Sequence, residues 1–211
     1  VYLKNEEKII TKGETKAIIG SNYNFLSSDM IFLKKDQKLV SKNKSSITDK
    51  NFNLYEFDNF EYLIDRKLLK ANNLKVTTNY TSSDNQKDIF NFENGFFNLD
   101  SKDFIAKGTK INVKKNIFDN TDNDPRIEGV SSKKKGDITE INKATFTSCK
   151  KDDNCPPWSI NADKIIHDSK KKQLIYKDAL LKIYDIPVLY FPKFFHPDPT
   201  VKRQSGLLQP R

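Results

Sequence analysis

The chain has 211 residues, of which 36% are apolar and 31% charged, and its formal net charge at pH 7 is +9. The apolar share suffices only for thin sheets, and no run approaches the roughly 18 apolar residues of a membrane-spanning helix. The lysines fall mostly in expected turns, such as Lys133–Lys135 and Lys170–Lys172, which argues against a nucleic-acid-binding protein. A weaker functional interpretation of the positive charge is attraction to anionic lipid phosphates.

Aromatic residues are plentiful, with 15 Phe and 8 Tyr, while Asn, Asp, Ser and Lys punctuate the chain. This composition favours an all-β protein. The chain opens on Val1, holds Met30 as its single methionine and shows no signal peptide, so we expect it to be a piece of a longer chain.

A unit of apolar run, polar turn and apolar run recurs along the chain. Its turns centre near residues 36, 66, 101 and 169, and the runs that flank the first three are 29–33 and 38–40, 60–64 and 68–71, and 96–99 and 104–106. Gaps of about 30 to 35 residues indicate a loose repeat with one degenerate copy, expected around Gly136–Ser148. Because one such unit cannot bury its apolar face alone, neighbouring units must stack and share an interior.

The C-terminal unit has the clearest alternation. Trp158, Ile160 and Ala162 alternate with polar residues, which is typical of a strand with one buried face. A polar turn at 167–172 leads to a second run in which Ala179, Leu181 and Ile183 share a face.

Prolines then dominate the exit from this unit. Pro192, Pro197 and Pro199 remove backbone donors, so Phe191–Thr200 is expected to be a stiff extended connector and not a central strand. Its aromatic side chains would suit a membrane–water interface, or simply pack against the last strand.

The order and spacing of these C-terminal residues carry a family resemblance. The run Trp158–Asp168, the run Ile186–Pro192 and the segment His196–Pro210, which reads HPDPTVKRQSGLLQP, together resemble the LptD (OstA/Imp) family of outer-membrane lipopolysaccharide assembly proteins. The resemblance covers roughly fifty residues, and upstream only the general pattern is similar.

The resemblance implies a fold and a domain organisation. The fold is an all-β, folded-over, V-shaped β-jellyroll of the OstA/LptA type. Residues 1–190 would form this periplasmic domain, and 191–211 the Pro- and aromatic-rich connector and the start of the first strand of a β-barrel, which is itself missing. By resemblance Pro210 lies in that barrel strand, where its missing N–H would weaken the barrel seam.

Some strands carry apolar groups on both faces, which leaves two interpretations open. One is two-sided packing in a sandwich, and the other is a greasy groove that covers the acyl chains of a lipid. The candidate lining residues of such a groove are Met30, Phe32, Tyr62, Ile64, Leu99, Phe146, Ile160, Leu181 and Ile183.

The resemblance also implies partners. These are lipopolysaccharide, an LptA-type bridge that docks at the N-terminal edge, and an LptE-type lipoprotein and the outer membrane, both reached through the missing barrel. The expected edge is Asn5–Ile19. The expected location is the periplasmic face of the Gram-negative outer membrane.

Cys149 and Cys155 flank a polar loop, and a local disulfide between them is the leading expectation. The resemblance adds pairing of one cysteine with the end of the missing barrel, and a reduced pair is the third possibility. A metal site is not expected, because no CxxC pair occurs and His167 and His196 are separated.

We expect neither an enzyme nor a cofactor. No nucleophile motif and no Gly-rich phosphate loop accompany the His167-Asp168 pair. The alternatives to an LptD-like domain are an LptA- or LptC-like bridge or scaffold module and an unrelated repetitive β structural protein.

Overall fold

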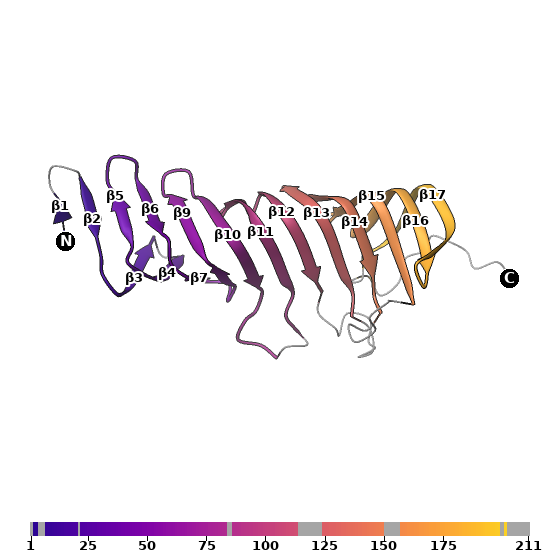
Figure 1. The fold of residues 1–211 in the computed structure, drawn as a ribbon, viewed down its shortest axis with the longest axis horizontal. Helices are drawn as coiled ribbons and strands as arrows, with labels where there is room; N and C mark the ends of the chain where they lie inside the picture. Colours follow the sequence, from indigo (N-terminus) through magenta and orange to yellow (C-terminus); the bar gives the residue numbers. More distant parts are fainter. Residues whose placement is uncertain are drawn as a thin grey trace.

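The computed structural model describes residues 2–3, 7–20, 22–83, 86–113, 124–149, 157–198 and 201. Within these ranges, seventeen strands form one open, antiparallel sheet, which confirms the all-β jellyroll expected from the sequence. The strands lie side by side along the longest axis, with β1 and β2 at one end and β17 at the other (Figure 1). No helix in the described part of the chain has the length and apolarity needed to span a bilayer.

The strands divide by length into two groups. The first nine are short, with bounds β1 Tyr2–Leu3, β2 Lys8–Ile10, β3 Glu14–Ile19, β4 Tyr23–Ser28, β5 Ile31–Leu33, β6 Lys38–Ser41, β7 Ser45–Asp49, β8 Leu54–Phe57 and β9 Asn59–Leu63. The other eight are long, with bounds β10 Leu68–Thr77, β11 Ile89–Asn98, β12 Phe104–Asn112, β13 Arg126–Lys135, β14 Ile138–Thr147, β15 Trp158–Asp168, β16 Gln173–Ile183 and β17 Ile186–Pro197.

Strand β10 joins the two groups because it pairs with two short strands at once. Its first half, Leu68–Asn72, pairs with β9, and its second half, Lys75–Thr77, pairs with β8. From there one arm runs β9–β6–β5–β2–β1 and the other runs β8–β7–β4–β3. The short strands therefore form two layers that diverge toward the N-terminal end.

The long strands all bend along one line, which we call the fold line. On alternate strands it passes through Asn73, Gly108, Lys143 and Asp178, each 35 residues after the one before and each with φ between 46° and 60°. Neighbouring long strands keep the same pairing register on both sides of this line. The two residues that face each other at the line itself are not paired by backbone hydrogen bonds.

The bend changes which residues of a strand face inward. The residues two before and one after each fold-line position are all buried, namely Ala71 and Leu74, Ala106 and Thr109, Ile141 and Ala144, and Tyr176 and Ala179. A flat strand would place residues three apart on opposite faces. The sheet is therefore folded over, so that both halves of each long strand turn the same face toward one interior.

That interior contains two clusters of buried apolar side chains. The first is built mainly from the short strands, β10 and β11, and includes Phe25, Phe60 and Tyr62. The second is built from β12 to β16 and includes Ile165 and Tyr176. Phe90 packs against both, so the apolar interior is continuous along the molecule.

The hairpins predicted from the sequence are confirmed. Turns at 34–37, 64–67, 99–103 and 169–172 separate paired strands. The degenerate copy expected around Gly136–Ser148 is the hairpin of β13 and β14, whose turn contains Gly136 with a φ of 56°.

The connector expected from Phe191 onward is wrong for residues up to Pro197. These residues belong to β17, which runs through the expected boundary between 190 and 191 and pairs with β16 along its length. Within the described ranges β16 is the sole partner of β17, so β17 is an edge strand, which is where proline is tolerated in a sheet. The sequence-based prediction that Phe191–Thr200 is not a central strand agrees with this placement.

The N-terminal edge also differs from expectation. The expected edge, Asn5–Ile19, contains strands β2 and β3. Strand β2 is flanked by β1 and β5, whereas β3 has β4 as its only partner in the described chain. The exposed edges at this end are thus β1 and β3, one on each arm.

Candidate functional site: the inner apolar face

The inner face of the folded sheet opens at the N-terminal end into an apolar cavity of about 250 Å³. It lies between the two arms, because β2, β5 and β6 supply one wall and β3 the other. Its lining residues are Ile9, Thr11, Thr15, Lys16, Ala17, Ile19, Met30, Phe32, Leu39 and Ile64. This cavity, which we call the N-terminal mouth, is an apolar opening beside the first buried cluster.

Three of the nine predicted lining residues meet at this mouth. Met30 is buried, and Phe32 and Ile64 are partly buried against the first cluster. Tyr62 and Leu99 lie deeper in the same cluster, each with 1% of its surface exposed. The sequence pattern thus identified inward-facing residues at this end, although Tyr62 and Leu99 are packed and do not line open space.

The other four predicted residues belong to the C-terminal half. Phe146 is buried in the second cluster, and Ile160 packs against it. Leu181 lies directly opposite Ile160, and Ile183 directly opposite Trp158, so both share the inner face. Ile183 is nevertheless 46% exposed.

The inner face is open at the C-terminal end as well. Leu189, paired with Leu181, and Ile186, paired with Ile183, continue this face onto β17. Leu189 is 50% and Ile186 65% exposed. Apolar side chains of the interior therefore reach solvent at both ends of the molecule.

The sequence interpretation missed several inward residues. Ala17 and Ile19 line the mouth, and the alternation of β3 could have indicated them. Tyr176, which is fully buried, was missed because the bend at Asp178 shifts the inward face of β16, so that Tyr176 and Ala179 point the same way.

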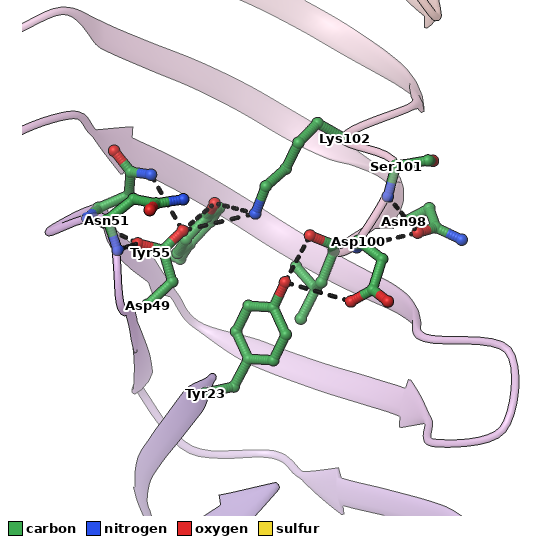
Figure 2. A network of polar contacts seen from close by, with 10 residues as sticks. Tyr23, Asp49, Asn51, Tyr55, Asn98, Asp100, Ser101 and Lys102 are labelled. Atoms are coloured by element: carbon green, nitrogen blue, oxygen red, sulfur yellow. Dashed lines mark hydrogen bonds and ion pairs between the residues drawn. The ribbon is translucent and has the colours of Figure 1, made fainter. Parts of the chain in front are cut away.

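A polar network that the sequence did not reveal joins the two layers (Figure 2). Asp49, with only 3% of its side chain exposed, accepts hydrogen bonds from the backbone N–H groups of Asn51 and Asn53, both at 2.9 Å. It also accepts a hydrogen bond from the Tyr55 hydroxyl at 3.2 Å and forms an ion pair with the Lys102 ammonium at 3.4 Å. Lys102 comes from the turn between β11 and β12, so this contact ties that turn to β7 and β8.

Tyr23 completes the network from β4. Its hydroxyl donates to the backbone carbonyl of Leu99 at 2.6 Å, and the Lys102 ammonium lies 5.5 Å from the centre of its ring and 5.6 Å from that of Tyr55. Such cation–π geometry stabilises a half-buried ammonium. The network therefore holds the two layers together beside the first cluster.

The ionisation of the network follows from burial and charge. Burial alone would raise the pKa of Asp49, but hydrogen bonds from Asn53 and Asn51 and the charge of Lys102 outweigh it and hold that pKa below its ordinary value. Burial, reinforced by the charges of Asp100 and Asp49, raises the pKa of Tyr23 to about 12. At neutral pH the network thus holds the ionised carboxylates of Asp49 and Asp100 together with neutral tyrosines.

Both histidines lie at the other end of the interior. They lie on β15 and β17, opposite Leu174 of β16 from either side, so one strand separates them. His167 contacts the Asp198 carboxylate. The Nε2 atom of His196 accepts a hydrogen bond from the Tyr176 hydroxyl at 2.8 Å, and its Nδ1 atom donates one to the Pro197 carbonyl at 2.6 Å. Burial lowers the pKa of His196, so it is neutral at pH 7.

Neither arrangement supplies an activated nucleophile or a metal centre. Among the described residues no group of three His, Cys, Asp or Glu side chains is placed to hold a metal ion. Cys149 forms no disulfide within the same ranges, and Cys155 and Pro210 lie outside the described residues, so the expectations on both stay untested.

Comparison with known proteins identifies what this chain is similar to. Over 76 residues it is 36% identical to a protein of Xanthomonas euvesicatoria pv. vesicatoria (strain 85-10), and over 70 residues 37% identical to one of Legionella pneumophila (strain Paris). Both are named LPS-assembly protein LptD. The LptD resemblance seen in the sequence is therefore confirmed by curated relatives from two genera.

The extent of this similarity is limited on both sides. The matches cover 36% and 33% of this chain but only 9% and 8% of the LptD relatives, so the chain matches about a tenth of their length. No family model matches the chain.

Proposed function

We propose that this chain is the periplasmic jellyroll domain of an LptD-like protein and that it carries lipopolysaccharide through its interior. The observation that supports this most directly is the continuous apolar inner face, which reaches solvent at an N-terminal cavity and again at Ile183, Ile186 and Leu189. A packed sandwich needs no opening at either end.

Physical chemistry explains why such a face suits this substrate. Each acyl methylene that leaves water gains about 0.8 kcal/mol, so a route through the periplasm must keep the chains covered at every step. The N-terminal mouth offers Met30, Phe32 and Ile64 to the first methylenes. Bonds such as that between the Tyr23 hydroxyl and the Leu99 carbonyl hold the two layers together.

Three further proposals follow from the relatives and the edges. An LptA-type bridge would dock at β1 and β3, the exposed N-terminal edges, through backbone pairing. The lipid would leave at β17 for an outer-membrane barrel with an LptE-type partner. The domain would then lie at the periplasmic face of the outer membrane.

Site-specific photocrosslinking to lipopolysaccharide tests the lipid path. Crosslinkers replace Phe32 and Leu181 on the inner face, and the matched controls replace Phe96 and Ile105, which face outward and are 50% and 68% exposed. We expect lipopolysaccharide adducts at the two inner positions only. Equal labelling at all four positions, or none at any, would leave a packed scaffold and refute the lipid path.

A further inference from the structure

The outer face of the three C-terminal strands carries an unusual row of charge. Lys164 of β15 lies directly opposite Lys177 of β16, which in turn lies directly opposite Lys193 of β17. Like charges in directly opposed positions destabilise a sheet. The fold itself gains nothing from placing three lysines in this row.

Two lysines elsewhere on the outer face stand opposite acids. Lys75 pairs with Glu56 at 3.2 Å and Lys110 with Glu128 at 3.5 Å, each across a directly opposed position. In the C-terminal row, Lys164 has an acidic neighbour, Glu140 at 3.0 Å.

The two outermost lysines of the row lack such compensation. Lys177 and Lys193 form no ion pair with any residue that the structure describes. Asp163 and Asp178, the acids next to the row in sequence, lie on the fold line, where Asp178 accepts a hydrogen bond from Tyr190 at 2.8 Å.

An apolar row runs beside the lysine row on the same face. Ile166, Ile175 and Phe195 lie directly opposite one another, each two residues from a lysine of the row. Phe195 is 52% exposed, and the inward neighbours Ile165 and Tyr176 are fully buried, so both rows point away from the core. Strand spacing makes each row about 10 Å long and sets the rows about 7 Å apart.

We propose that these two rows form a docking patch for the surface of an anionic phospholipid bilayer. The lysine ammonium groups would contact lipid phosphates, while the isoleucines and Phe195 would enter the boundary between headgroups and acyl chains. The area between the rows, roughly 70 Å², is on the scale of single headgroups and far below the ~800 Å² that each partner buries in a stable protein interface.

This patch is independent of the lipid path through the interior. It lies on the opposite face of the same strands, so a bilayer and an acyl chain can be bound at once. Failure of the patch leaves the crosslinks from Phe32 and Leu181 unaffected.

Vesicle flotation of the chain tests the charged row. We expect binding to vesicles of phosphatidylglycerol and phosphatidylethanolamine, weaker binding as salt rises, and little binding to phosphatidylcholine. Lys177→Gln with Lys193→Gln should lower the affinity on the order of 20-fold, about fivefold for each lysine. The control, Lys75→Gln with Lys110→Gln, makes the same charge change on the same outer face and should change affinity less than about threefold, since those lysines are already paired.

A depth measurement tests the apolar row. A Phe195→Trp variant should be quenched by lipids with brominated acyl chains, whereas a Phe96→Trp variant, at an outward position of similar exposure, should not. Equal quenching of both variants, equal loss of binding in both double variants or equal binding to neutral vesicles would overturn the proposal. So would loss of binding to dispersed lipopolysaccharide with vesicle binding unchanged, because the lysines would then serve the glycolipid.

Discussion

The fold line makes a sharp prediction about glycine substitutions. Lys143 lies on it with a φ of 46°, in a region that costs an L-residue about 1–2 kcal/mol and that glycine occupies freely. A glycine in a strand lowers the free energy of unfolding by about 0.5–1 kcal/mol, because it gives the unfolded chain more conformational freedom. A Lys143→Gly variant should therefore be more stable than the parent, by about 0.5–1 kcal/mol.

The matched control is Lys107→Gly, one position before the fold line on β12. Lys107 is exposed and its φ is not positive, so glycine there should destabilise the chain by about 0.5–1 kcal/mol. The two variants should differ by roughly 1.5 kcal/mol, which is about 3–6 °C in Tm for a chain of this size. Thermal unfolding followed by the fluorescence of Trp158, which packs on the second cluster, reports this difference. If both substitutions lower the Tm equally, the sheet does not bend at Lys143.

Three further predictions concern packing and ionisation. A Gly95→Ala methyl would lie 2.6 Å from the backbone carbonyl oxygen of Ile105, so this variant should lose about 1–3 kcal/mol, seen as a lower urea midpoint. Because the folded-state pKa of Asp49 is depressed, the ionised carboxylate stabilises the fold above the unfolded pKa of about 3.9, and this stabilisation is lost as pH falls through the folded-state pKa. In an Asp49→Asn variant, the free energy of unfolding should therefore fall less steeply with decreasing pH in this acid range. The pKa of His196 is likewise depressed, so stability should decline as pH falls below about 6.5, and a His196→Gln variant should show a smaller decline when unfolding is measured from pH 7 to pH 5.

Each of these has a contrary result. A Gly95→Ala chain as stable as the parent would show that β11 and β12 do not approach as closely as described. Identical acid limbs for the parent and Asp49→Asn would show that Asp49 is not held ionised by its neighbours. A parent chain whose stability is constant from pH 7 to pH 5 would place His196 in water.

The sequence predicted the hairpins well because their signals are local. Polar turns between apolar runs fix where the chain reverses, and all four expected turns occur. Of the predicted lining residues, Met30, Phe32 and Ile64 lie at one cavity, and their role in lipid binding stays a prediction. It missed Tyr176, because a single residue in the left-handed region changes the inward face without changing the residue pattern nearby.

Long-range arrangement was inaccessible to local reasoning. Tyr23 and Leu99 are 76 residues apart and touch only because the two arms diverge from β10. The same holds for Lys102 and Asp49, whose pairing depends on both layers being in place.

The sequence alone determined the all-β class, the hairpin positions and the LptD resemblance, since composition, turn chemistry and motif order are properties of neighbouring residues. Only the tertiary structure decided that every long strand bends at one line, that the apolar interior opens at both ends, and that three lysines face one another on the outside. These features depend on register between strands, and register is set when all the strands pack together.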